Sequence, residues 1–167
     1  SLSGYFEVEL TDAGGNVDTI IQAPVVIVGE VIGDGVAGTA TFASYITRNF
    51  ETIIVALTDQ TENASVGTDK VTFRAPYGIT LTSVRASSSV APVGSELIMD
   101  INEGGTSILS TKLSIDAGET TSTTATNPAV ISDSALADDA LISLDIDQVG
   151  SGTAGAGVKV YLLGYRT

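Results

Sequence analysis

The chain has 167 residues and a mass of 17.0 kDa, and its 20 acidic against 7 basic residues give a net charge of −13. It contains no cysteine and no histidine, which excludes disulfides, thiolate chemistry and every histidine-based nucleophile or metal ligand. The charge repels nucleic-acid phosphates and anionic membrane surfaces, so we expect neither as a partner.

The composition favours strands over helices. Apolar residues make up 43% of the chain and aromatic residues only 5%, so Val, Ile, Leu and Ala must build the core. Together with many Thr residues and 18 Gly, this favours strands and turns. We therefore predict an all-β fold, an antiparallel β-sandwich of jelly-roll type preceded by an N-terminal β-hairpin or strand arm.

The first expected element is a hairpin. Residues 4–10 alternate between polar and apolar side chains, residues 12–16 form a Gly- and Asn-containing turn, and residues 17–21 resume as a strand.

A continuous apolar run follows at residues 25–32, interrupted only by Gly29 and Glu30. It is too short to cross a bilayer, and its continuous apolar character indicates a strand buried on both faces. We expect this burial to need a partner subunit. The expected partner-binding residues are Val25, Val26, Ile27, Val28, Val31 and Ile32.

The glycine-rich segment 33–38 superficially resembles a phosphate-binding loop. Such a loop needs a helix directly after it, but residues 39–46 are typical of a strand. An ordinary turn is therefore the favoured interpretation.

A boundary near residue 56 divides an N-terminal docking region, residues 1–56, from a sandwich domain, residues 57–167. The strand-like segment 52–57 fits either the last strand of the first region or the first strand of the second.

The sandwich strands are predicted from period-two alternation and from the turns between them. A Pro-Tyr-Gly corner at residues 76–78 separates the first two strands, and the segment 134–139 fits one helical turn. The expected strands are 71–74, 79–85, 96–102, 106–110, 112–115, 140–147 and 158–165.

Acidic side chains suggest one candidate site. Asp145 and Asp147 share a strand face, and Asp100 could lie on a neighbouring strand. Paired carboxylates can serve a glycosidase, and clustered oxygens can hold calcium. Neither spacing matches a defined calcium loop, so a solvated sheet face is favoured, with Asp145 and Asp147 as weak calcium candidates and no catalytic residue.

Two other candidates are weaker. Ser110 and Lys112 could form a Ser-Lys nucleophile pair, but such a pair requires a lysine with a lowered pKa. Tyr161 and Tyr165 share a face of the last strand, where they could stack on a sugar; core packing or a subunit contact is the favoured alternative. We therefore expect no enzymatic activity and no cofactor.

Several segments resemble a β-sandwich family common among virion proteins of tailed phages, over about residues 57–167. They are VTFRAPY (71–77), LTSVR (81–85), GSELIMDINEGG (94–105), STKLSID (110–116) and DIDQVG (145–150). The resemblance implies a structural virion component, such as a capsid decoration protein, head fibre or tail-associated protein. We expect a homo-oligomer, a trimer, that binds other virion proteins such as the major capsid protein. The alternative is a fibre module that binds a surface carbohydrate or receptor.

Overall fold

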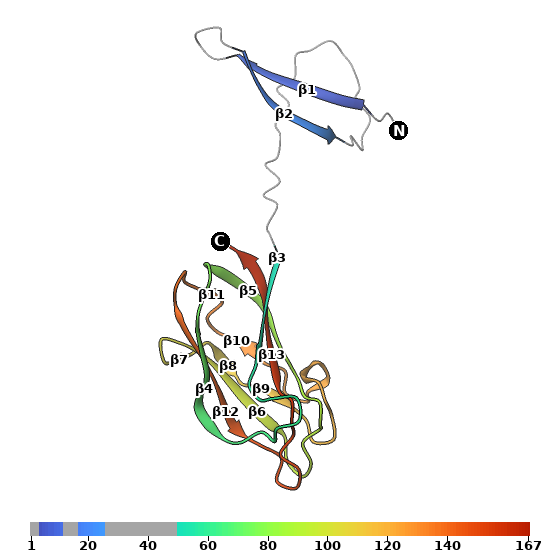
Figure 1. Cartoon of the computed structure of the whole chain (residues 1–167), viewed down its shortest axis with the longest axis vertical. Helices are drawn as coiled ribbons and strands as arrows, with labels where there is room; N and C mark the ends of the chain where they lie inside the picture. The colour runs from blue at the N-terminus through green and yellow to red at the C-terminus, as the bar shows by residue number, and fades with distance from the viewer. Residues whose placement is uncertain (1–3, 12–16, 26–49) are drawn as a thin grey trace. The chain divides into compact units, whose positions relative to one another are not determined.

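The computed structural model describes residues 4–11, 17–25 and 50–167, with side chains from Phe50 onward. The chain divides into two compact units, Ser1–Ser44 and Tyr45–Thr167 (Figure 1). No helix in the described part of the chain is long and apolar enough to cross a membrane.

The N-terminal unit contains the expected hairpin. Strand β1 (Gly4–Thr11) pairs antiparallel with β2 (Val17–Val25), with an irregularity between Val8 and Glu9. Val25 ends β2 opposite Gly4. The rest of the expected partner-binding run, Val26, Ile27, Val28, Val31 and Ile32, lies outside the described residues, as does the glycine-rich segment 33–38.

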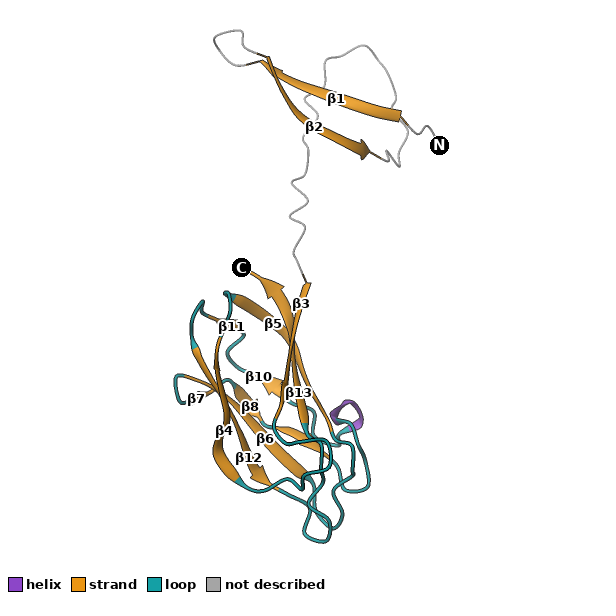
Figure 2. Cartoon of the chain, viewed as in Figure 1, coloured by secondary structure: helices purple, strands orange, loops and turns teal. Residues whose placement is uncertain are grey.

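The second unit is the predicted all-β antiparallel sandwich (Figure 2). One sheet has the order β11-β5-β13-β3 and the other the order β4-β12-β6-β7, with β9 also paired to β6. Strands β8 and β10 form a separate two-stranded ladder. The bounds are β3 Phe50–Ala56, β4 Gly67–Arg74, β5 Ile79–Ser87, β6 Leu97–Glu103, β7 Thr106–Ser107, β8 Leu109–Thr111, β9 Leu113–Ile115, β10 Val130–Ile131, β11 Ala135–Leu136, β12 Leu141–Gln148 and β13 Lys159–Arg166.

Strand β3 belongs to the sandwich, which decides between the two interpretations of segment 52–57. It pairs with β13 from Phe50 opposite Tyr165 to Ala56 opposite Lys159, without a register shift. Residues 50–56, grouped with the N-terminal docking region from the sequence, are therefore the first strand of the second compact unit.

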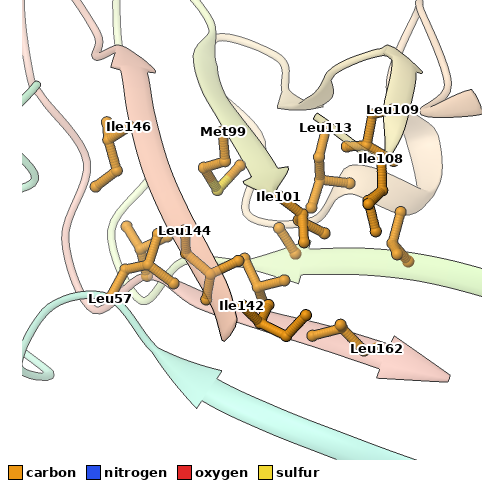
Figure 3. Packing of buried hydrophobic residues seen from close by; sticks show 14 of the residues in the cluster. Leu57, Met99, Ile101, Ile108, Leu109, Leu113, Ile142, Leu144, Ile146 and Leu162 are labelled. Atoms are coloured by element: carbon orange, nitrogen blue, oxygen red, sulfur yellow. The ribbon is translucent and has the colours of Figure 1, made fainter. Parts of the chain in front are cut away.

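Aliphatic side chains fill the space between the two sheets (Figure 3). The alternation of β12 turns Ile142, Leu144 and Ile146 inward, where they meet residues of β6 and β13. The largest fully buried side chains are Ile79, Leu97, Met99, Ile101, Ile108, Leu113, Ile115, Ile142, Leu144, Ile146, Val158 and Leu162. Among the described residues this apolar cluster forms the core.

The helical turn expected at residues 134–139 is wrong. Ala135 pairs with Thr80 and Leu136 with Ile79, so these residues form β11 at the edge of the first sheet. Leu136 is buried, and its burial against the core outweighs the local preference. The short helix that does occur, η1 (Ser122–Thr124), is a single 3₁₀ turn in the Thr- and Ser-rich segment.

We expect Leu144→Ala to lower the free energy of unfolding by about 2–5 kcal/mol, because it opens a cavity among close-packed side chains. Leu141→Ala on the same strand is the matched control, since Leu141 is 44% exposed, and should cost less than about 1 kcal/mol. Urea denaturation measures both; equal losses would contradict the assignment of Leu144 to the core.

Candidate functional site

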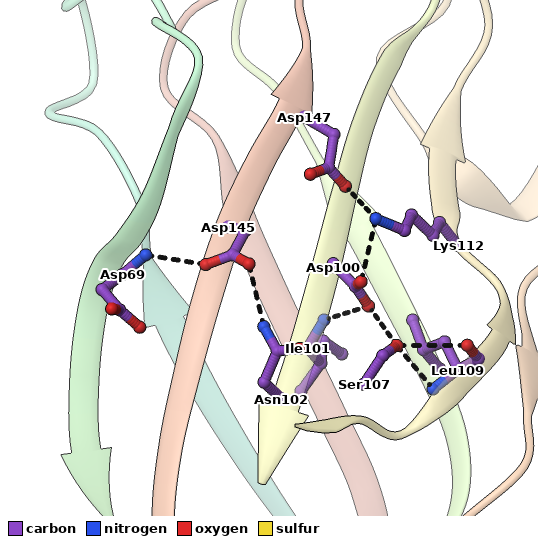
Figure 4. Close-up of polar contacts among 9 residues, drawn as sticks. All are labelled: Asp69, Asp100, Ile101, Asn102, Ser107, Leu109, Lys112, Asp145 and Asp147. Carbon is purple, nitrogen blue, oxygen red and sulfur yellow. Dashed lines mark hydrogen bonds and ion pairs between the residues drawn. The ribbon is translucent and has the colours of Figure 1, made fainter. Parts of the chain in front are cut away.

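The acidic side chains singled out in the sequence lie on the outer face of the sheet β4-β12-β6-β7 (Figure 4). The register places Asp145 of β12 opposite Asp100 of β6, as the sequence left open. Asp147 follows on β12, beside Lys112 at the β8–β9 junction. Antiparallel pairing thus gathers three carboxylates from β6 and β12, and one ammonium from the β8–β9 junction, onto one face.

Asp100 is the most buried member, with only 4% of its surface exposed. Its Oδ1 accepts hydrogen bonds from the backbone N–H of Ile101 at 2.8 Å and from the Ser107 hydroxyl at 2.6 Å. Its Oδ2 lies 3.0 Å from Lys112 Nζ. A buried carboxylate is tolerated only when it is paired and hydrogen-bonded, and Asp100 meets both conditions.

Lys112 links the two neighbouring carboxylates. Its Nζ donates to Asp147 Oδ2 at 2.8 Å and lies 3.0 Å from Asp100 Oδ2. Hydrogen bonds to Asp147 and to Asp100 raise the pKa of Lys112 above its ordinary value of 10.5. The ammonium therefore stays charged and lies between the two carboxylates. No group of three or more His, Cys, Asp or Glu side chains in residues 50–167 could hold a metal.

Asp145 fastens β12 to both of its neighbours. Its Oδ1 accepts from the backbone N–H of Asp69 at 2.7 Å, and its Oδ2 accepts from Asn102 Nδ2 at 2.9 Å. Asp69 adopts a φ of 50° in a bulge of β4, where Leu144 pairs with Val71 but Ile146 pairs with Gly67. Asp145 thus acts as a cross-strand tie, with each of its oxygens accepting one hydrogen bond.

The Ser110–Lys112 pair does not have the properties of a nucleophile and base. The Ser110 hydroxyl donates to the carbonyl of Val130, whereas Lys112 is bound by Asp100 and Asp147. A lysine base needs a lowered pKa, but that of Lys112 is raised.

Sequence reasoning missed three members of the polar network, Asp69, Asn102 and Ser107. They contact Asp145 or Asp100 from β4, β6 and β7. Asn102 could have been found from the sequence, because the alternation of β6 places it on the same face as Asp100. Asp69 and Ser107 could not, because their contacts depend on the bulge in β4 and on the register between β6 and β7.

The opposite outer face, on β3, β13 and β5, has a different character. Tyr161 pairs with Ile54 and Arg85, and its Oη lies 3.0 Å from Ser87 Oγ. Tyr165 contacts Phe50 edge to face, with ring centroids 5.6 Å apart. The outward residues of these three strands include no carboxylate; Arg85 and Lys159 are their charged members.

A shallow hollow of about 280 Å³ lies on this face beside Tyr161. Its walls include Arg85, Ser87, Thr121 and Thr123. Both tyrosines are half-buried, so Tyr161 and Tyr165 lie on the outer sheet face instead of in the core.

No protein-family model matches the sequence, and no curated protein is significantly similar to it. The polar network and the carboxylate-free face are therefore interpreted from their own geometry.

We expect Lys112→Met to lower the free energy of unfolding at pH 7 by about 1–2 kcal/mol, because it leaves the buried Asp100 carboxylate without its cation. This expected loss is smaller than for a fully buried ion pair, because 46% of the Lys112 side chain is exposed and solvent screens the interaction. Combining Lys112→Met with Asp100→Asn should restore part of the loss. Lys159→Met, which removes an exposed hydrogen bond to Gln60, is the control; an equal loss there would contradict the role of Lys112.

The raised pKa of Lys112 predicts a loss of stability at alkaline pH. Its ordinary pKa of 10.5 applies to the unfolded chain and the raised value to the folded one, so the folded state holds this proton more tightly. The stabilisation is complete below pH 10.5 and disappears as the pH rises through the folded-state pKa. The difference in melting temperature between wild type and Lys112→Met should therefore shrink above that pH. A difference that stays constant would contradict the ion-pair assignment.

Proposed function

We propose that this chain is a structural virion component that binds and bridges neighbouring subunits as a capsid decoration or appendage protein. The virion context comes from the resemblance of residues 57–167 to tailed-phage sandwich proteins. The proposal includes self-association and attachment to other virion proteins, such as the major capsid protein.

The observation that supports a binding role most directly is the outer face of β3, β13 and β5. Phe50 is 55% exposed and Ile54 is 59% exposed, and they continue into a half-buried row with Tyr161, Leu163 and Tyr165. Exposed apolar and aromatic side chains grouped on one face are typical of protein contact surfaces. In a chain of net charge −13, a face without carboxylates is also where another protein meets the least repulsion.

The chemistry of the opposite face is consistent with a structural role. The carboxylates and the lysine that resemble catalytic groups are held in hydrogen bonds that join β4, β12, β6 and the β8–β9 segment. These contacts fix strand register and leave a polar, hydrated surface, which keeps a large particle soluble.

Carbohydrate or receptor binding is a second candidate function, favoured by the hollow beside Tyr161. An aromatic ring flanked by Arg85 and by hydroxyl groups of Ser87, Thr121 and Thr123 offers stacking and hydrogen bonds to a sugar. Glycan binding that is selective and is lost in Tyr161→Ala would favour this function over a purely structural one.

Attachment to the particle tests the proposal. We expect low-resolution imaging to locate the protein on assembled virions, and purified protein to co-sediment with particles that lack it. Val26→Asp, in the expected partner-binding run, should abolish co-sedimentation, because a carboxylate cannot enter an apolar interface without a large cost. Val66→Asp is the control, since Val66 is 60% exposed on the loop between β3 and β4. A protein absent from particles, or one that attaches equally well with Val26→Asp, would contradict the proposal.

A further inference from the structure

We propose that β3 is an edge at which two copies of this chain join, strand to strand, about a twofold axis. The inference concerns the self-association included in the proposed function and does not depend on a virion context. A strand at the end of a sheet presents unpaired N–H and C=O groups to any strand that approaches, and β3 is the last strand of the order β11-β5-β13-β3.

The other edges of the two sheets are short or protected, as edges of soluble proteins usually are. Strands β11 and β7 have two residues each. Strand β4 carries Lys70 and Arg74 on its outer side and is interrupted by the bulge at Asp69. These features make pairing with a second strand unfavourable at β11, β7 and β4.

Strand β3 has none of these protections. It is seven residues long, Phe-Glu-Thr-Ile-Ile-Val-Ala, and contains no proline and no lysine. Its single charged residue, Glu51, alternates to the same side as Ile53 and Val55, away from the exposed residues. Its pairing with β13 has no register shift, and no strand in the described part of the chain pairs with its other side, so this edge is continuous.

The register shows which backbone groups lie on that edge. Leu57 N–H donates to the carbonyl of Val158, the residue opposite it, at 2.8 Å. Because hydrogen-bonded and non-hydrogen-bonded pairs alternate in antiparallel sheets, Val55 and Ile53 bond to β13 in the same way. The N–H and C=O groups of Thr52, Ile54 and Ala56 therefore point away from β13, toward the free edge.

A second copy fits this edge on grounds of both symmetry and charge. Two β3 strands that run antiparallel about a twofold axis supply each other's donors and acceptors and join two four-stranded sheets into one. Two chains of charge −13 repel each other over most of their surface, but the outward side of β3 and its neighbour β13 has no carboxylate. This arrangement gives a dimer, in contrast to the trimer expected from the sequence.

Sedimentation equilibrium of the full chain, with edge variants, tests the inference. We expect wild type at micromolar concentration to have twice the chain mass of 17.0 kDa. Thr52→Pro should be monomeric, since it removes an edge N–H and keeps the bonds to β13; Thr52→Ala, which keeps that N–H, should remain dimeric. Ile54→Lys should also be monomeric, because it places like charges at the edge, whereas Val66→Lys, at a position of similar exposure, should not.

Hydrogen exchange provides a readout in the same samples. The amides of Thr52, Ile54 and Ala56 should be protected in the dimer and lose that protection on dilution, whereas those of Ile53 and Val55 should stay protected. A wild-type chain that is monomeric or trimeric overturns the inference, as does a dimer that survives both Ile54→Lys and a folded Thr52→Pro. These substitutions leave residues 1–44 unchanged, so particle attachment can be measured on the same variants. A variant that loses the dimer but still attaches to particles shows that the two proposals can be tested separately.

Discussion

The sandwich depends on close packing of aliphatic side chains between two antiparallel sheets. No disulfide can supplement this packing, since the chain has no cysteine, and few aromatic rings are present to contribute large buried areas. The buried residues of β12, among them Leu144, therefore meet β6 and β13 side chains of similar size. Burial of such side chains contributes about 1.5–3 kcal/mol each, and it depends on the inward and outward alternation of the central strands. That alternation also fixes which residues reach the two outer faces.

The outer faces differ because the carboxylates are placed unevenly. On the sheet β4-β12-β6-β7, Lys112 neutralises the buried Asp100 and the neighbouring Asp147, and Asp145 uses both oxygens to tie β12 to β4 and β6. The carboxylates of this face are thus hydrogen-bonded or ion-paired within the sandwich. On the opposite sheet, Phe50 and Ile54 remain exposed with no carboxylate among the outward strand residues. Burying those side chains removes apolar surface from water at little electrostatic cost.

The alternation of the central strands made the sandwich and the shared face of Asp145 and Asp147 predictable from sequence. The sequence left open whether Asp100 lies near Asp145, and the register places the two residues opposite each other. Other features depend on long-range pairing. The segment containing Leu136 looked helical because its own residues favour a turn, but it is held as a strand by β5. The partners of Lys112 come from β6 and β12, and nothing in the local sequence specifies that approach. Strand β3 looked equally suited to either unit, and only its pairing with β13 decides the matter.

Strands β3 and β4 differ in how their edges are protected against pairing with another strand. Both strands end a sheet of the same sandwich, and both have free backbone groups along one side. In β4, a bulge at Asp69 and the charged side chains of Lys70 and Arg74 make pairing with another strand unfavourable. A lysine or proline in place of Thr52 or Ile54 would also make strand pairing at β3 unfavourable. Such a residue would cost the core almost nothing, because neither side chain is buried. The regular edge of β3, whose outward residues carry no charge, contrasts with the protected edge of β4 and is better explained by a strand that pairs with it.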